Sequence, residues 1–371
     1  MRRLLFLIPV FALSSCALLH FFSPSANNTL NQPQWSGMFS LEDISDPRNY
    51  SITVDESDRI FTGVYYPSTK FAILSASDIN EEWATNFQSY ASSMDALKIA
   101  YNNKWNMTFA TQSGGPAQIV FDSSTSGWSA FGASFSAAAM PYWDYFFNSN
   151  GDPFVLTLNS PSSFLITTND KPDLPGNPWV QYQSFSKDVG YLILDYSADV
   201  DAHGNVFAGT GDFNTSQIFF NGEGGVCSSY TIPDGSEYAK IAVDGNDDIY
   251  VIYKSMDDRI MARKMSYVYP NITDMGAITL YNEAFFVGSL HNLGLSVAAD
   301  KNSTRIYVGF ITFDNHKPMV IKIENGNALP MPAFPDYLTN CDSIKLAVNQ
   351  DGLPVAAVLQ SPTLHIYKTW D

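Results

Sequence analysis

The stretch KIAVDGNDDIYVIYK, residues 240–254, reads as a short apolar strand, a turn rich in Asp, Gly and Asn, and a second apolar strand. Asp and Asn favour such turns because their side chains hydrogen-bond the nearby backbone, and Gly because it adopts positive φ at no steric cost. A single hairpin is compatible with many folds. Its recurrence along the chain decides between them.

The same hairpin recurs so that the chain contains seven copies. In each copy an apolar residue precedes a turn residue, here called the anchor, and another apolar residue follows six positions later. The anchors, spaced 43 to 56 residues apart, are Asp55, Tyr101, Asn148, Asp201, Asp244, Asp300 and Asn349. Strand–turn–strand units that repeat at about 49 residues are typical of a β-propeller, in which blades stack radially to bury their faces. The sequence therefore predicts an all-β, seven-bladed β-propeller with four-stranded antiparallel blades.

The two ends of the chain are predicted to share the last blade. The seventh repeat supplies three strands before Asp371, whereas WSGMFSLED, from Trp35, precedes the first repeat and has no repeat of its own. This segment is similar to WSAFGASF, from Trp128, which follows the third strand of the second repeat. An unpaired edge strand is a liability for a sheet. We therefore predict that residues 35–41 pair with residues 364–368 and close the ring.

The composition suits many half-buried strands and disfavours several functions. Charged residues make up 15% of the chain and aromatic residues 14%, a balance typical of pleated strands. The net charge of −17 disfavours binding to nucleic acid and to anionic lipid headgroups. Five His residues and the lack of a CxxC pair argue against a metal site, and we predict no metal and no cofactor. The calcium-like DVDAHGN is better explained as a hairpin turn that recurs in every blade.

The first sixteen residues, MRRLLFLIPVFALSSC, predict export. Two arginines precede an apolar stretch that would span only about 15 Å as a helix, half of a bilayer core, so we interpret it as a signal peptide. The LSSC ending resembles the lipobox of bacterial lipoproteins. That resemblance implies a lipid such as palmitate on Cys16, and Ala17 after it favours the outer membrane. The alternative is an ordinary secretory peptide with Cys16 incidental.

These predictions divide the chain into a signal peptide at 1–16, a flexible tether at 17–34 and a propeller at 35–371. The predicted location is the bacterial cell envelope, with a lipid anchor, and the choice between inner and outer membrane stays open. Cys227 and Cys341 fall in blades that are not neighbours, so we predict two unpaired thiols.

The repeat A-V-D-x-x-G-x-x-Y-V, with a later strand ending near Trp, resembles sialidase-like and NHL-type seven-bladed propellers over residues 45–371. The resemblance implies the fold rather than an activity. The chain lacks the S-x-D-x-G-x-T-W box of true sialidases. Its arginines outside the signal peptide, too few and too often in turns for a sialidase site, are Arg48, Arg59, Arg259, Arg263 and Arg305.

The innermost strand of each blade indicates where a ligand would bind. Four residues before the anchors lie Ser51, Leu97, Asp144, Ser197, Lys240, Ser296 and Lys345, of which six are polar. Two residues before the anchors lie Thr53, Ile99, Phe146, Asp199, Ala242, Ala298 and Ala347, among which Asp199 is the only charged residue. We expect the first of these rows to face the central channel near its mouth. A buried carboxylate needs a cation or several donors, and Lys240 is the first guess for Asp199.

The candidate binding residues at the channel rim are therefore Asp144, Asp199, Lys240 and Lys345, and the alternative is a structural ion pair or a solvated channel residue. We predict a monomeric, membrane-tethered binding protein or interaction scaffold for a protein or glycan ligand, with no catalytic residue assigned. The rival function is a glycoside hydrolase or lyase acting at the channel mouth, which would need two suitably spaced carboxylates. Trp105 and Trp143 are candidates for stacking on a sugar, although core packing explains most aromatic residues of propellers.

Overall fold

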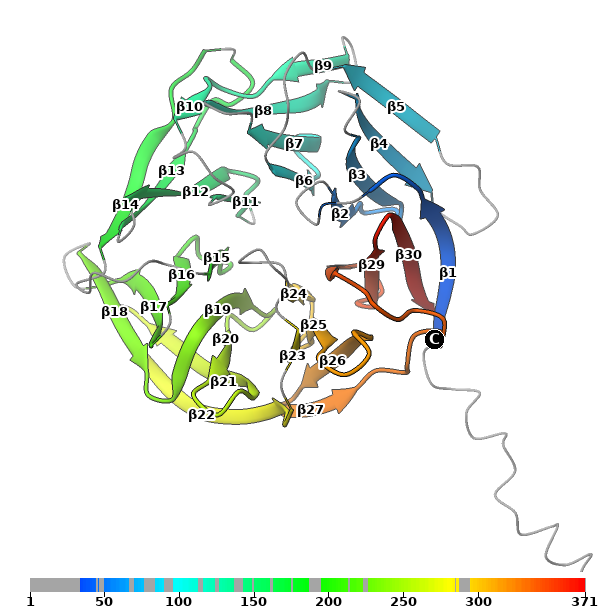
Figure 1. Cartoon of the computed structure of the whole chain (residues 1–371). Coiled ribbons are helices and arrows are strands. Elements are labelled where there is room, and N and C mark those ends of the chain that lie inside the picture. The colour runs from blue at the N-terminus through cyan, green and yellow to red at the C-terminus, as the bar shows by residue number, and fades with distance from the viewer. Residues whose placement is uncertain are drawn as a thin grey trace, which may run out of the picture.

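The structure is a computed structural model, and it describes residues 34–44, 46, 50–66, 70–76, 84–89, 96–112, 116–123, 127–136, 143–148, 150–160, 163–174, 176–186, 195–212, 214–222, 226–283, 285–286 and 294–370. In this part of the chain thirty strands form seven antiparallel sheets around a central axis (Figure 1). The predicted all-β propeller with seven blades is confirmed.

Four blades come from residues 50–232. The first contains β2(Tyr50–Val54), β3(Ile60–Tyr66), β4(Lys70–Ala76) and β5(Ala84–Ser89). The second contains β6(Ala96–Asn102), β7(Asn106–Gln112), β8(Pro116–Ser123), β9(Gly127–Ala130) and β10(Phe135–Ser136). The third contains β11(Trp143–Phe147), β12(Pro153–Ser160), β13(Ser163–Thr168) and β14(Val180–Ser186). The fourth contains β15(Asp195–Val200), β16(Val206–Gly211), β17(Ser216–Asn221) and β18(Cys227–Ile232).

Three blades follow. The fifth contains β19(Gly235–Val243), β20(Ile249–Ser255), β21(Ile260–Val268) and β22(Asn271–Tyr281). The sixth contains β23(Phe285–Phe286), β24(Leu295–Ala299), β25(Ile306–Thr312), β26(Pro318–Glu324) and β27(Asn327–Pro330). The seventh contains β28(Ser343–Val348), β29(Pro354–Gln360), β30(Thr363–Trp370) and, from the other end of the chain, β1(Gln34–Leu41).

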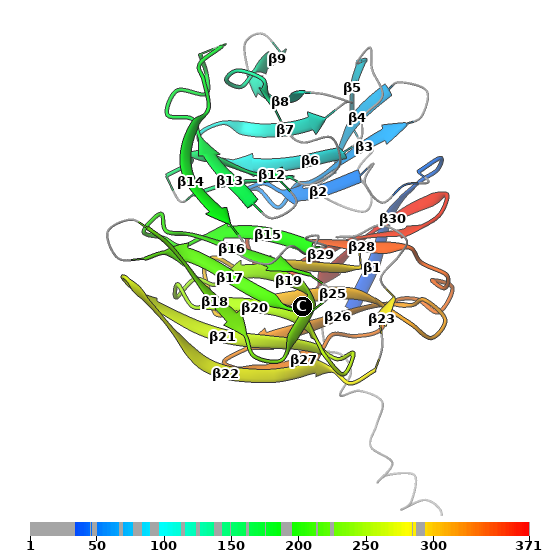
Figure 2. The same ribbon diagram turned by 60° about the vertical axis from the view of Figure 1, so that its left-hand side comes forward.

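Two blades have five strands rather than the predicted four, because one position of the sheet is divided between two short strands. Strands β9 and β10 both pair with β8, and strands β23 and β24 both pair with β25. Each of these blades therefore keeps a width of four strands. Figure 2 shows the strands of a blade side by side, with β22 at the outer edge of the fifth.

The inner strands form a closed ring. In chain order β2, β6, β11, β15, β19, β24 and β28 each contact the next, and β28 contacts β2. The apolar faces of neighbouring blades are buried between them: one cluster joins Tyr250 and Ile252 of the fifth blade to Val308 and Phe310 of the sixth. Burial of this kind is what stabilises blades that cannot fold alone.

The closing strand is confirmed. Strand β1 pairs with β30 in antiparallel register from Gln34 opposite Trp370 to Leu41 opposite Leu364, and the two strands lie side by side in Figure 1. Met38 and Leu41 are buried in the cluster that joins the seventh blade to the first. The strand begins at Gln34, one residue before the predicted boundary.

The predicted signal peptide, Cys16 and residues 17–33 of the predicted tether lie outside the described residues. Over the residues that are described, no helix is long and apolar enough to cross a membrane. Cys227 is partly buried in β18, Cys341 is buried before β28, and both are free thiols, as predicted.

Candidate functional site

The anchors are turn residues that organise the end of each inner strand. The Asp244 Oδ1 accepts hydrogen bonds from the N–H groups of Asn246 and Asp248, at 2.8 and 3.0 Å. Asp55, Asn148 and Asp201 make the same pair of bonds. Glycines in three of these turns have positive φ, with values of 77°, 87° and 71° at Gly151, Gly204 and Gly352. The recurring turn is thus an Asx turn, which explains why Asp and Asn recur there.

The anchor predicted in the second blade is wrong by one residue. Tyr101 lies within β6, opposite Met107, and the turn residue is Asn102, whose Oδ1 accepts the Lys104 N–H at 2.9 Å. The aromatic Tyr suits a strand, whereas Asn suits the turn. The shift matters for function because the residue four before the true anchor is Lys98 rather than Leu97. All seven residues at this position, here called the inner ring, are therefore polar.

Four members of the inner ring hold neighbouring blades together. Each places a side-chain oxygen against a backbone N–H of the next inner strand, an edge whose N–H groups need acceptors. The donor–acceptor pairs are Ile99 with Ser51 at 3.1 Å, Ala198 with Asp144 at 3.4 Å, Ile241 with Ser197 at 2.6 Å, and Leu346 with Ser296 at 3.0 Å. The polar ring was predicted from sequence, but this role was not.

The other three members are Lys98, Lys240 and Lys345, here called the channel lysines. Lysine has no acceptor, so it cannot make the bond that Ser or Asp makes at the same position. The Lys98 ammonium contacts the Asp144 carboxylate, and the Lys240 Nζ donates to the Tyr196 carbonyl at 3.3 Å. The Lys345 Nζ donates to the Tyr50 carbonyl and lies 4.4 Å from the centre of the Tyr50 ring.

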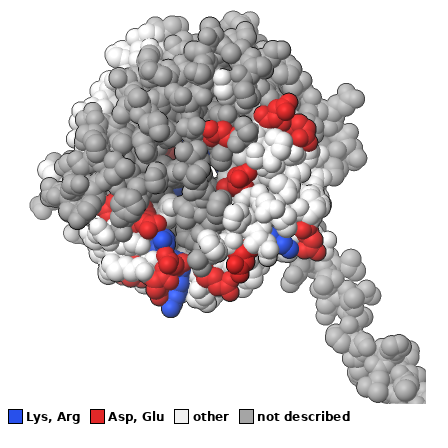
Figure 3. All heavy atoms as spheres, viewed as in Figure 1, with Lys and Arg blue, Asp and Glu red and all other residues white. Residues whose placement is uncertain are grey.

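The inner ring surrounds a cavity of about 400 Å³ on the axis of the propeller. All seven members line it, together with Asp199 and apolar residues of the same inner strands. The four candidate residues Asp144, Asp199, Lys240 and Lys345 are therefore brought together around one space. On the face shown in Figure 3 the described surface carries more acidic than basic side chains, with a hollow near the centre of the ring. The channel lysines thus contrast with the net charge of −17.

Confinement in the channel lowers the pKa of two channel lysines. Burial, reinforced by the charges of Lys240 and Lys345, lowers the pKa of Lys98 to about 7, while Asp199 opposes the shift. Burial also lowers the pKa of Lys345 to about 7, with Asp46 opposing and Lys240 reinforcing the shift. The Lys98 side chain is 37% accessible to water within the channel, and its contact with Asp144 favours the charged form. The three ammoniums are close enough for their charges to repel.

Asp199 is held by a cation and by backbone donors, as predicted, but the ion pair is made with Lys301. The Lys301 Nζ lies 2.7 Å from the Asp199 Oδ2, which also accepts the Val243 N–H at 2.8 Å. Lys240, which was predicted to pair with Asp199, donates instead to the Tyr196 carbonyl. Lys301 directly follows the anchor Asp300 and reaches across the fifth blade, where it also donates to the Val243 carbonyl at 2.9 Å. No pattern within one repeat would have identified it.

The two tryptophans proposed for sugar stacking have different outcomes. Trp105 donates its indole N–H to the Gly151 carbonyl at 2.7 Å and packs edge-on against Phe131 at 5.3 Å between ring centres. These contacts give Trp105 a packing role between the second and third blades. The Trp143 side chain lies outside the described part of the structure.

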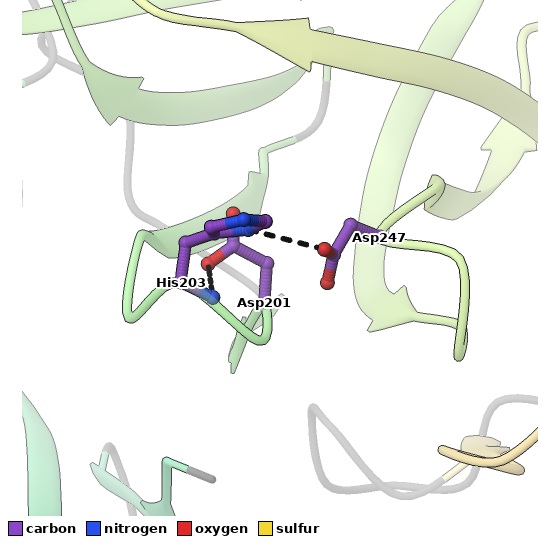
Figure 4. A group of neighbouring side chains, drawn as sticks. All are labelled: Asp201, His203 and Asp247. Carbon is purple, nitrogen blue, oxygen red and sulfur yellow. Dashed lines mark hydrogen bonds and ion pairs between the residues drawn. The ribbon is translucent and has the colours of Figure 1, made fainter. Parts of the chain in front are cut away.

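Among the described residues, one group of side chains has the composition of a metal site. Asp201, His203 and Asp247 place their ligand atoms within 4.8 Å of one another, and Figure 4 shows His203 facing Asp247. The turn geometry accounts for both carboxylates. Asp201 is the anchor of its own turn, and the Asp247 Oδ1 accepts the Ala202 N–H at 2.7 Å. Asp58 makes the equivalent bond to the Gln350 N–H, also at 2.7 Å, with no His in the pair.

Comparisons with known proteins identify the fold of the chain. No family model matches the chain, and no curated protein sequence matches it. Among solved structures, BBS1N, crystallised in complex with ARL6DN and soaked with lead, is 12% identical, with a TM-score of 0.54 over 91% of this chain and 97% of that one. The β-propeller domain of Myceliophteria thermophila Cps50 (Swd1) is 10% identical, with a TM-score of 0.56 over 90% of this chain and 99% of that one. The similarity is one of architecture, and the chain has the fold of a β-propeller.

Proposed function

We propose that the chain is an exported, lipid-tethered binding protein whose ligand enters the central channel. The observation that carries the proposal is the convergence of seven polar inner-ring side chains, three of them lysines, on one cavity of about 400 Å³. This volume lies within the range of small-molecule sites, which combine an apolar wall with a few convergent polar groups. The cavity wall meets that description, because Ile52, Leu295 and Leu346 also line it.

The rival function, a glycoside hydrolase or lyase, finds less support. Such enzymes need one carboxyl group to donate a proton and a second carboxylate nearby. Among the described residues that line the cavity, the two carboxylates are Asp144 and Asp199. Asp144 accepts a backbone N–H and contacts Lys98, and Asp199 accepts a backbone N–H and pairs with Lys301. Within the described lining, both acids therefore serve as structural acceptors.

A second candidate, binding of a protein partner at the outer edge, is favoured by the β21–β22 hairpin. Val268, Tyr269 and Met275 are 73%, 56% and 61% exposed there, which is unusual for large apolar side chains. The similar propeller BBS1N was crystallised in complex with ARL6DN, which agrees with a protein-binding role for this architecture. The channel and the hairpin belong to different strands, so one measurement separates the two candidates.

Hydrogen–deuterium exchange tests where the ligand binds. Purified full-length protein is incubated with the low-molecular-mass fraction and, separately, with the protein fraction of a cell extract. We expect the small molecules to slow exchange in inner strands such as β19 and β28. Slower exchange confined to β21 and β22, seen only with the protein fraction, would contradict the channel proposal and support a protein partner.

The predicted lipid anchor is tested by one substitution. Cys16→Ser removes the only sulfur on which the lipobox chemistry can act, so the protein should move from the membrane to the soluble fraction on cell fractionation. Cys227→Ser is the matched control, because it removes a thiol from β18 and should leave the protein in the membrane fraction. A Cys16→Ser protein that stays in the membrane after normal cleavage would refute the anchor.

A further inference from the structure

We propose that the channel lysines form a binding site for a compact anion with two or more negative charges, of the phosphate or dicarboxylate class. The inference rests on the proposed function, because it names the chemistry of the ligand that the channel takes. It concerns Lys98, Lys240 and Lys345 together.

The three lysines are arranged around the axis rather than clustered on one side. They belong to the second, fifth and seventh blades, so that three, two and two steps separate them around the ring. All three occupy the same position, four residues before the anchor, which places their ammoniums at one level of the channel. This near-trigonal arrangement matches an anion that presents oxygens in several directions, and lysine is a common point-charge ligand of phosphate.

The charge balance of the cavity also favours an anion. Among the described lining residues are three lysines and two aspartates, and one of those aspartates, Asp199, is already paired with Lys301. The described lining therefore holds one more lysine than aspartate, and two more lysines if Asp199 is counted as neutralised by Lys301. Because repulsion between confined like charges is unfavourable, an anion that bridges the ammoniums would relieve it.

A purely structural explanation of the lysines is weaker. At four of the seven inner-ring positions Ser or Asp accepts a hydrogen bond from the next blade. A lysine replaces that bond by a contact with an acceptor on a neighbouring inner strand. It also brings a charge into the channel, where its desolvation is costly. Three such replacements at one level are explained by a ligand that needs ammonium groups.

The pH dependence of binding follows from the groups around each lysine. Lys98 faces Lys240, Lys345, Asp144 and Asp199, while Lys345 is influenced by Asp46 and Lys240. In the free protein confinement lowers the pKa of Lys98 and Lys345 to about 7. A bound anion favours the protonated form, so binding takes up protons near neutral pH and weakens as pH rises from 7 to 8.5.

Calorimetric titration of the full-length protein with inorganic phosphate and, separately, with succinate tests the site. Chloride at equal ionic strength is the reference. We expect saturable 1:1 binding of one or both anions at pH 7, and a heat that changes between buffers of different ionisation enthalpy because protons are taken up. Lys240→Met and Lys345→Met should each weaken binding by at least about tenfold, as expected for loss of a charge-assisted hydrogen bond.

Lys317→Met is the matched control, because Lys317 pairs with Asp336 at 3.2 Å outside the cavity and its loss changes the net charge equally. Binding should be unaffected in this variant. Absence of binding by both anions, or equal weakening in Lys317→Met, would overturn the anion site. If inner strands are nevertheless protected by the small-molecule extract, the channel function stands and only the anion class fails. Loss of that protection as well would refute both.

Discussion

Deletion of residues 34–41 is expected to abolish cooperative folding, or to lower the free energy of unfolding by more than about 5 kcal/mol. The deletion removes β1 and leaves β30 as an open edge. It also removes three buried side chains, Trp35, Met38 and Leu41, two of which lie in the cluster between the first and last blades. Without them, the ends of the ring would meet only through the remaining side chains of those blades.

The control deletion is residues 26–33, which immediately precede β1 and should change stability little. A point variant separates the contribution of the Trp35 side chain from that of strand pairing. The Trp35 indole stacks on Phe334 at 4.3 Å and donates to the Pro332 carbonyl at 2.9 Å, so Trp35→Ala should cost about 3–5 kcal/mol. Urea unfolding monitored by circular dichroism measures all three. Equal stability of the two deletion variants would show that β1 does not close the ring.

Lys345→Met is expected to stabilise the protein at pH 7 by about 1–2 kcal/mol, because a long apolar side chain replaces a confined cation. This sign is informative. If the bond from Lys345 to the Tyr50 carbonyl, and its position over the Tyr50 ring, were its main role, the substitution would destabilise the protein. A stabilising substitution that weakens anion binding would show that the channel lysine is retained for binding at a cost in stability.

The pH dependence of the free energy of unfolding tests the same explanation, which is the confinement of the Lys345 cation. Confinement lowers the pKa of Lys345 from 10.5 to about 7, so between these values the unfolded chain binds more protons and stability rises with pH. After allowance for water in the channel, the rise from pH 7 to 8.5 attributable to Lys345 is about 1 kcal/mol. Lys345→Met should lose this part of the rise, whereas Lys317→Met should keep it.

Other groups set the limits of that window. Burial lowers the pKa of His365, so the effect of this residue on the pH dependence of stability lies below about pH 6.5. Burial raises the pKa of Cys227 and Cys341 to about 12, so their unfolded thiols ionise first and reduce stability only above about pH 8.5. Identical pH profiles for Lys345→Met and the unmodified protein between pH 7 and 8.5 would contradict the assignment.

Local chemistry explains why the blades could be predicted. The turn of each hairpin is fixed by a side chain that bonds to its own backbone, as Asp244 does, so seven turns are recognisable without knowledge of their neighbours. The one misplaced anchor, Tyr101 for Asn102, results from the requirement for an apolar residue six positions later, which Met107 meets for Tyr101 and Thr108 fails for Asn102. Choosing Asn102 would have revealed Lys98 from sequence. Pairing of β1 with β30 was also predictable, because an unpaired strand and an unpaired edge were both visible.

The sequence by itself determined the repeat, the turns, the closing strand and a row of polar residues on the inner strands, because each depends on contacts within one repeat or on the count of strands. Tertiary structure alone decided how that row is used. The bonds from the Ile99 N–H to Ser51 and from Lys301 to Asp199 join residues 48 and 102 positions apart, and no local pattern specifies such partners. The convergence of Lys98, Lys240 and Lys345 likewise required the ring to close, since only closure brings side chains of separate blades around one axis.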